Sequence, residues 1–230
     1  GWMNSDIKLA TLSDTDDTDV TGSELVTNGT FDSDVSGWTA GDGATVTHQS
    51  GRMRVDGNVG TANQAITTVV GKSYTVSADL FNGTSASSAI YVSTTTSSAQ
   101  MLASFSSPAN RVTFTATATT TYIIARVNAA SNTYIEVDNI SVRLAEQDRS
   151  VNGNGLQVFG TITKTAVASG ADLVGYGPFT NANYLAQPYN SDLNFGTGDF
   201  CIMGWFKLDS NSGSSRIVYR QEDTSNRWTL

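Results

Sequence analysis

The sequence predicts an all-β protein, built as a jelly-roll β-sandwich followed by the partial strands of a second sandwich. Three observations predict this class. Thr, Ser, Gly, Val and Asn dominate the composition and only 15% of the residues are charged, which favours strands over helices. Apolar and polar residues alternate with period two in many short segments. Clusters of Gly, Asn or Ser interrupt those segments at intervals that are typical of a sandwich or barrel.

The first 22 residues are predicted to form a short N-terminal strand and an acidic linker. Ile7, Leu9 and Leu12 mark the strand-like piece, and the stretch Asp14 to Asp19 follows it. This stretch has no apolar periodicity, and it lacks the glycine and the closing glutamate of an EF-hand loop. We therefore interpret it as a linker, with a calcium loop as the alternative.

Residues 23–146 are predicted to form the jelly roll. Tyr74, Val76, Ala78 and Leu80 alternate with polar residues, so the apolar set faces a core. About ten segments share such patterning, a number that is typical of a jelly roll. They lie near 24–28, 43–48, 51–56, 62–69, 72–82, 88–95, 99–106, 110–117, 121–128 and 133–144.

A polar, Gly- and Asn-rich stretch predicts a linker over residues 147–154. A second β-rich unit is expected over 155–230, with strand-like segments at 160–168, 184–189, 200–208 and 215–221. It stops before a sandwich could close, so we expect the chain to be a piece of a longer protein. Unpaired strand edges tend to recruit another chain, which makes further copies of this protein expected partners.

Charge and composition exclude several classes of partner. The formal net charge of −8 would repel nucleic acid and the anionic face of a membrane. No apolar run reaches the roughly 18 residues that a membrane span needs, and the N-terminus lacks the pattern of a signal peptide. The single cysteine, Cys201, lies in an apolar run and is expected to be a small buried hydrophobe.

Four motifs carry a family resemblance. They are Glu24–Asp32 with its Asn-Gly-Thr-Phe core, Ser36-Gly37-Trp38, Ser50–Met53 and the closing Tyr134–Val142. Taken together and in this order, they resemble the family 4/9 carbohydrate-binding modules. The resemblance implies a jelly-roll sandwich that binds glycan chains in a cleft and has no catalytic activity of its own.

The same resemblance implies a structural calcium ion where the first and last strands meet. Matching the motifs assigns the carbonyls of Thr30 and Gly51 and the carboxylate of Asp138 as ligands, with Asp32 or Asn28 as helpers. Calcium prefers oxygen ligands of this kind. The alternative is that Asp138 only caps a turn through backbone hydrogen bonds.

The resemblance also points to the polar face of a sheet as the glycan cleft. Tyr122 and Arg126 share one side of a predicted strand, while Ile123, Ala125 and Val127 lie on the other. The predicted contacts to carbohydrate are Arg54, Gln64, Tyr91, Tyr122 and Arg126. The alternative for each tyrosine is a half-buried position at the rim of the sandwich, and Trp38 is predicted to be a core residue.

The second unit resembles the start of a laminin-G or concanavalin A-like domain. The motifs that carry this likeness are Tyr184–Pro188, Asn194–Phe200 and Ile202–Lys207. The run from Asn152 to Phe179 resembles segments between such domains in phage tail and tail-fibre proteins. This likeness implies a place in a virion tail or fibre, or outside the cell, with other tail proteins as further partners.

No constellation for catalysis is apparent in the sequence. Glu136-Val137-Asp138 resembles part of a glycoside hydrolase pair, but the second glutamate that such a site needs is missing. The single histidine, His48, has no partner for a metal site or a nucleophilic triad. The sequence therefore predicts a non-catalytic protein that attaches to a polysaccharide or cell-surface glycan. The competing hypothesis is a structural spacer that binds no ligand.

Overall fold

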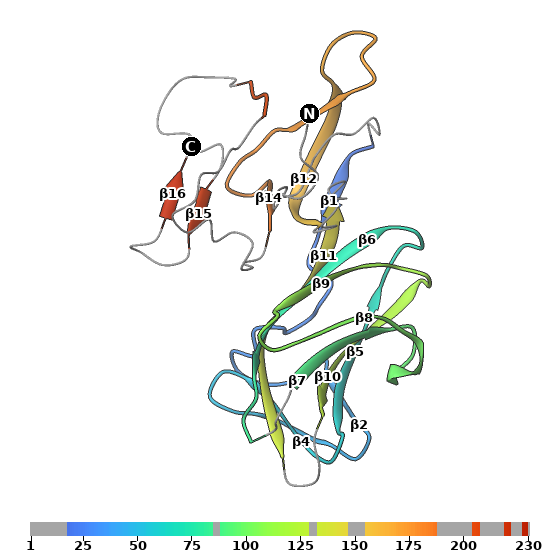
Figure 1. Ribbon diagram of the computed structural model, residues 1–230, viewed down its shortest axis with the longest axis vertical. Coiled ribbons are helices and arrows are strands. Elements are labelled where there is room, and N and C mark those ends of the chain that lie inside the picture. The colour runs from blue at the N-terminus through green and yellow to red at the C-terminus, as the bar shows by residue number, and fades with distance from the viewer. Residues whose placement is uncertain are drawn as a thin grey trace, which may run out of the picture. The chain divides into compact units, whose positions relative to one another are not determined.

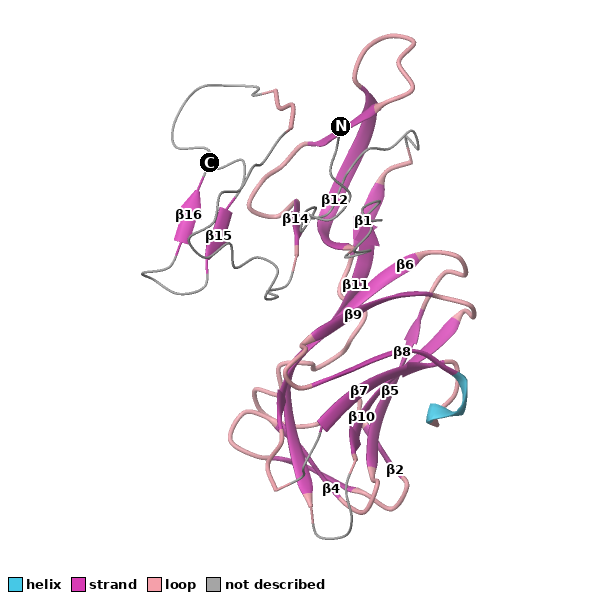
Figure 2. Ribbon diagram, viewed as in Figure 1, coloured by secondary structure: helices cyan, strands magenta, loops and turns pink. Residues whose placement is uncertain are grey.

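The computed structural model describes residues 18–84, 88–128, 133–146, 155–187, 204–207, 219–221 and 227–229. It divides into two compact units, Gly1–Asn190 and Ser191–Leu230. Strands make up nearly all of the regular structure drawn in Figure 2, beside one short 3-10 helix, η1 (Ser98–Gln100). Within the described ranges, no helix is long and apolar enough to cross a membrane. The prediction of an all-β fold is confirmed.

Two antiparallel sheets form a sandwich in the first unit (Figure 1). We call them sheet A and sheet B. Sheet A is ordered β3 (Thr45–His48), β4 (Met53–Asp56), β11 (Tyr134–Glu146), β6 (Ser73–Phe81), β9 (Arg111–Thr115). Sheet B is ordered β2 (Thr39–Gly41), β5 (Thr61–Thr67), β10 (Thr120–Val127), β7 (Ser88–Ser93), β8 (Met101–Ser106).

The predicted strands from 43 to 144 all have counterparts in these two sheets, whereas the segment predicted near 24–28 is not a strand. It lies beside β11 and is held there by one backbone bond, from Leu25 N to Val142 O at 3.0 Å, and by the Glu24 side chain. Within these two sheets, β2 is the strand that the sequence did not reveal. Its three residues are too few to show alternation and include a glycine.

One apolar core fills the space between the sheets. Side chains from both sheets are fully buried there, because inward positions alternate with outward ones along each strand. The largest of them include Phe31, Met53, Val55, Val76, Ile90, Val92, Ile123, Val127, Ile135 and Val137. The prediction that Trp38 belongs to the core is confirmed, since it is only 8% exposed and its ring centroid lies 5.7 Å from that of Phe31.

A β-bulge keeps β11 in phase with the core. The register with β6 shifts between Asp138 and Ser141, and Asn139 has a φ of 51°. Asparagine tolerates this left-handed conformation better than most residues. Ile135 and Val137 face the core before the bulge, and Ile140 faces it after the bulge. Without the extra residue, strict alternation would turn Ile140 outward; with it, Ile140 faces the core.

A small β-extension continues from the end of sheet A. β12 (Leu156–Ala166) joins β11 at Ala145↔Gln157 and also pairs with β1 (Val20–Gly22), β13 (Val174–Gly177) and β14 (Tyr184–Ala186). Val20, Val158 and Ile162 form its own small core. Part of the predicted N-terminal linker is thus a strand of this extension. The predicted 147–154 linker lies outside the described residues.

A buried ion pair lies at the base of the extension. Lys164 Nζ is 3.5 Å from the Glu146 carboxylate, and the Tyr176 hydroxyl donates to the same carboxylate at 3.2 Å. Both charged side chains are almost completely buried. Removing either partner would leave the other charge buried without its counterion, so this pair fixes how β11, β12 and β13 come together.

The second unit shows one antiparallel pair in its described part, β15 (Tyr219–Gln221) and β16 (Arg227–Thr229). Residues 204–207 have no regular structure, although a strand was expected over 200–208. The N-terminal strand predicted around Ile7–Leu12, the acidic stretch from 14 to 17 and Cys201 all lie outside the described residues. The laminin-G-like interpretation of this unit stays a prediction.

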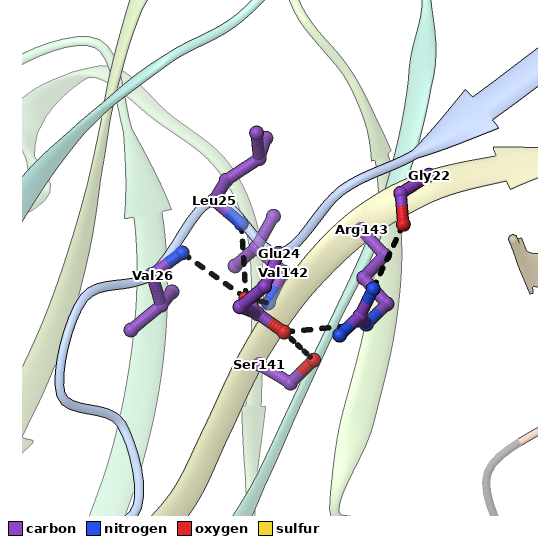
Figure 3. Close-up of polar contacts among 7 residues, drawn as sticks. All are labelled: Gly22, Glu24, Leu25, Val26, Ser141, Val142 and Arg143. Carbon is purple, nitrogen blue, oxygen red and sulfur yellow. Dashed lines mark hydrogen bonds and ion pairs between the residues drawn. The ribbon is translucent and has the colours of Figure 1, made fainter. Parts of the chain in front are cut away.

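The Glu24 carboxylate attaches the N-terminal segment to β11 (Figure 3). Oε1 accepts hydrogen bonds from the backbone N–H groups of Leu25, Val26 and Val142 at 2.8–3.1 Å. Oε2 accepts the Ser141 hydroxyl at 2.6 Å and lies 3.3 Å from Arg143 Nε. Ionised acceptors make stronger hydrogen bonds than neutral ones, so this side chain replaces the strand ladder that segment 24–28 lacks.

Replacing this carboxylate should weaken the whole first unit. We expect Glu24→Ala to lower the free energy of unfolding by about 2 kcal/mol, because hydrogen bonds to a charged group are lost and Arg143 loses its counterion. Chemical denaturation followed by circular dichroism measures this change. Asp172→Asn, at an exposed position, is the matched control. Equal stability of the two variants would contradict the role assigned to Glu24.

Candidate functional site

The outer face of sheet B brings together three of the five residues predicted to contact glycan. Tyr122 and Arg126 alternate with the core residues of β10 and therefore point away from the core. On the neighbouring strand β7, Tyr91 lies directly opposite Ile124, on the same outward side. The three side chains are thus close neighbours on one surface, as the sequence predicted for Tyr122 and Arg126.

Several residues of this outer face are buried. Thr61, Asn63 and Ile124 also point outward, yet they are only 2%, 8% and 1% exposed. Tyr91, Tyr122 and Arg126 are half-buried, whereas Ala65 opposite Tyr122 and Ser104 opposite Tyr91 are exposed. Two phenol rings and a guanidinium are thus partly accessible on this face.

Two of these residues contact each other. The Arg126 guanidinium lies over the Tyr91 ring, 5.6 Å from its centroid, in a cation–π contact. The Tyr91 hydroxyl lies within 3.2 Å of the Asn128 side-chain amide. These contacts hold the ring and the guanidinium in place before any ligand binds. Preorganisation of this kind lowers the entropic cost of binding.

Gln64 does not lie on this surface, so it does not join Tyr122 and Arg126 as the sequence predicted. It is opposite the core residue Ile123 and shares the inward phase of β5 with Ala62 and Ile66. Its Oε1 accepts Thr27 N at 2.7 Å, and its Nε2 donates to Thr27 O at 2.9 Å and to Gly37 O at 3.1 Å. The amide fastens the loop before β2 to sheet B.

Arg54 does not join this surface either, because it lies on the other sheet. It alternates with Met53 and Val55, which are buried, and so points outward from sheet A. Its guanidinium stacks on the Tyr134 ring at 3.5 Å and makes two bonds of 2.8 Å to Asp56. Hydrogen bonding to Asp56 raises the pKa of Arg54 above its usual value. These contacts hold it away from the face that carries Tyr122.

Thr61 and Asn63 also lie on the outer face of sheet B, although the sequence did not single them out. Thr61 donates to Asp42 at 3.2 Å, and the Asn63 amide donates to Thr39 O at 3.1 Å. Both strengthen the contact between β5 and the region around β2. The alternation along β5 could have indicated them, since Ala62, Gln64 and Ile66 lie on the inward side of the strand and Thr61 and Asn63 on the outward side. Because Gln64 is polar, the inward side was not recognised as the apolar one.

The residues predicted to bind calcium lie around the bulge of β11 and the loops near it. Thr30 Oγ1 donates to Asp32 at 2.9 Å, and Gly51 has a φ of 77° beside the Gln49–Arg52 turn. Asp138 Oδ1 accepts its neighbour Asn139 N at 2.7 Å, which is the turn-capping bond of the alternative interpretation. The described residues contain no group of three or more His, Cys, Asp or Glu placed to hold a metal.

The charge around Asp138 is compatible with a cation. Burial raises the pKa of Asp138 above its usual value, and the charges of Asp79 and Asp32 raise it further. The backbone bond from Asn139 and the positive charge of Arg52 act in the opposite direction. The carboxylate is therefore held in a partly desolvated place where a cation would stabilise it. Any calcium ion here would take carbonyl oxygens as well as this carboxylate.

No known family profile matches the chain, and no curated protein matches it either. Among solved structures, the chain is similar to a family 4 carbohydrate-binding module, with 19% identity and a TM-score of 0.42 over 51% of this chain and 98% of the other. It is also similar to a family 61 module in complex with β-1,4-galactotriose, with 12% identity and a TM-score of 0.39; the match covers 52% of this chain and 97% of the other. A further similar structure is tailspike protein 4 of bacteriophage CBA120, with 18% identity and a TM-score of 0.38; here the match covers 53% of this chain and 21% of the other.

The structural role of Gln64 can be tested by substitution. We expect Gln64→Ala to lower the free energy of unfolding by about 2–3 kcal/mol, because polar backbone groups of Thr27 and Gly37 lose their partner in a poorly hydrated place. Thermal unfolding followed by near-ultraviolet circular dichroism measures the effect through the environment of Trp38. Gln49→Ala, in an exposed turn, is the control and should change stability little. Wild-type stability of Gln64→Ala would contradict this role.

Proposed function

We propose that the sandwich is a non-catalytic carbohydrate-binding module that holds a glycan chain on the outer face of sheet B. The observation that carries the proposal is the cluster of Tyr91, Tyr122 and Arg126 on this surface. Aromatic rings offer apolar faces to the C–H groups of a sugar, and a guanidinium donates hydrogen bonds to its hydroxyl oxygens. The resemblance of the sequence motifs to family 4/9 modules supports the same function.

The wider setting is part of the proposal. The module would belong to a larger phage tail or bacterial surface protein, in a virion or outside the cell, and would mediate attachment to a host or substrate polysaccharide. The resemblance of residues 152–179 to segments of tail proteins supports this setting. The net charge of −8 leaves neutral polysaccharides as suitable partners and disfavours nucleic acid.

A structural spacer is the second candidate, and one observation favours it. Several polar groups of the outer face of sheet B are already bonded within the protein, including Thr61 to Asp42 and Asn63 to Thr39. Groups engaged in this way are less available to a ligand. The spacer would use the sandwich and its extension only for length and rigidity.

A glycan array with the full chain separates the two functions. We expect saturable binding to at least one polysaccharide, and a loss of affinity of about tenfold in Tyr122→Ala or Arg126→Ala, because each removes a central contact worth more than about 1 kcal/mol. Thr47→Ala, on the exposed edge strand β3, should bind as the wild type does. Absence of binding by a folded sample to every glycan would favour the spacer.

We further propose a structural calcium ion bound by the carbonyls of Thr30 and Gly51 and the carboxylate of Asp138. The support is the oxygen character of this set and the raised pKa of Asp138. When bound, calcium would supply positive charge that joins the loop after Asn28 to the bulge of β11. It would take no part in chemistry on the ligand.

Calcium should stabilise the wild type and leave Asp138→Asn unchanged. Without calcium, the raised pKa means that the ionised carboxyl destabilises the fold at pH values above that pKa. Asp138→Asn should then be more stable than the wild type near neutral pH, and this advantage should vanish as pH falls through the raised pKa. Melting temperatures in calcium and in chelator, across pH, measure both effects. Equal melting temperatures of the wild type in calcium and in chelator would contradict the calcium proposal.

A further inference from the structure

Two turns of the sandwich contain an asparagine followed by a glycine. Within the described residues, these pairs are Asn28-Gly29 and Asn82-Gly83. The side-chain carbonyl of an asparagine is open to attack by the backbone nitrogen of the next residue. Glycine hinders this attack least, because it has no side chain and adopts many backbone conformations. The structure gives the two pairs different surroundings, which decide how readily each reacts.

Asn82 lies in the turn after β6, and its side-chain carbonyl is polarised by two donors. Its Oδ1 accepts hydrogen bonds from the backbone N–H of Ser88 at 3.1 Å and from the Ser88 hydroxyl at 2.7 Å. Donors placed in this way stabilise the negative charge that gathers on a carbonyl oxygen when a nucleophile adds to its carbon. Asn82 and Gly83 are both exposed, so water reaches the reacting groups.

Asn28 is held in the opposite way, through the nitrogen that deamidation would expel. Its Nδ2 donates to Asp34 Oδ1 at 2.8 Å, to Asp34 O at 3.1 Å and to Ser36 O at 3.2 Å. Gly29 is fixed as well, since its carbonyl accepts Ile140 N at 2.9 Å and a Cβ on Gly29 would lie 2.0 Å from Ile140 O. Attack at Asn28 therefore requires several hydrogen bonds to break first.

We propose that Asn82 is a site of spontaneous deamidation, promoted by Ser88. Hydroxide removes the proton of Gly83 N, and this nitrogen forms a bond to Cγ of Asn82. The bond from Cγ to Nδ2 then breaks, and Nδ2 takes up a proton and leaves as ammonia. Water opens the resulting succinimide ring at either carbonyl, which gives aspartate or isoaspartate. The net change consumes one water molecule and releases one ammonia, with no oxidation or reduction.

This inference goes beyond the proposed function, because the reaction needs no ligand. Either product adds a negative charge to the turn between β6 and β7. Isoaspartate also lengthens the backbone by one carbon directly before Gly83. That glycine is packed closely, since a Cβ on it would lie 2.4 Å from the Tyr134 ring, on which Arg54 stacks. The isoaspartate form should therefore disturb the contact between this turn and the start of β11.

Peptide mass spectrometry of the full chain tests the site. The chain is incubated at mildly alkaline pH, once folded and once in urea, and the gain in mass is followed separately in the peptides that contain Asn28 and Asn82. For Asn82 we expect the folded chain to react at least as fast as the unfolded chain. For Asn28 we expect folding to slow the reaction by about tenfold or more, because its hydrogen bonds must break.

A variant tests the role of Ser88. Ser88→Ala removes the hydroxyl donor, and we expect deamidation of Asn82 to slow severalfold while that of Asn28 does not change. Ser104→Ala, at an exposed position on β8, is the matched control and should react at Asn82 as the wild type does. Circular dichroism checks that each variant is folded.

Three results would overturn the inference. They are slower reaction of Asn82 in the folded chain than in urea, reaction of Asn28 in the folded chain as fast as that of Asn82, and an unchanged or faster rate at Asn82 in folded Ser88→Ala. If Ser88→Ala does not fold, the comparison of folded and unfolded wild type decides.

Discussion

The pairing of β11 is the constraint on which the rest of the first unit depends. This one strand bonds to β4 and β6 within sheet A and then to β12 of the extension. It must satisfy these neighbours while keeping its apolar side chains in a single core. The bulge at Asn139 makes this possible, because one extra residue restores the inward phase for Ile140. Glu24 then attaches the N-terminal segment to the same strand, by accepting backbone N–H groups of both and the Ser141 hydroxyl of β11.

Polar side chains in this protein organise loops. Gln64 and Glu24 each accept backbone N–H groups of a segment that has no strand partner of its own. Such groups must be satisfied when they leave water, so one polar side chain can fix the path of several residues. The outer face of sheet B depends on such an anchor, since Gln64 holds the loop before β2 against this sheet.

The two sheets present different chemistry to the solvent. The outer face of sheet B carries Tyr91 and Tyr122 beside Arg126, next to buried polar side chains such as Thr61 and Asn63. On sheet A, arginines stack on aromatic rings and pair with carboxylates, as Arg52 does with Phe81 and Glu136. Such contacts engage the guanidinium groups within the protein and stabilise this face.

Period-two alternation and turn residues in the sequence were enough to determine the all-β class, nearly every strand of the sandwich and the outward placement of Tyr122 and Arg126. These properties are local, because each residue's side of a strand follows from its neighbours. The sheet that holds each strand is set by long-range pairing, and so only the tertiary structure separated Arg54 from Tyr122. It also decided that Gln64 points inward and that residues 20–22 pair with β12. Those facts depend on hydrogen bonds between residues far apart in the chain, which no local pattern in the sequence records.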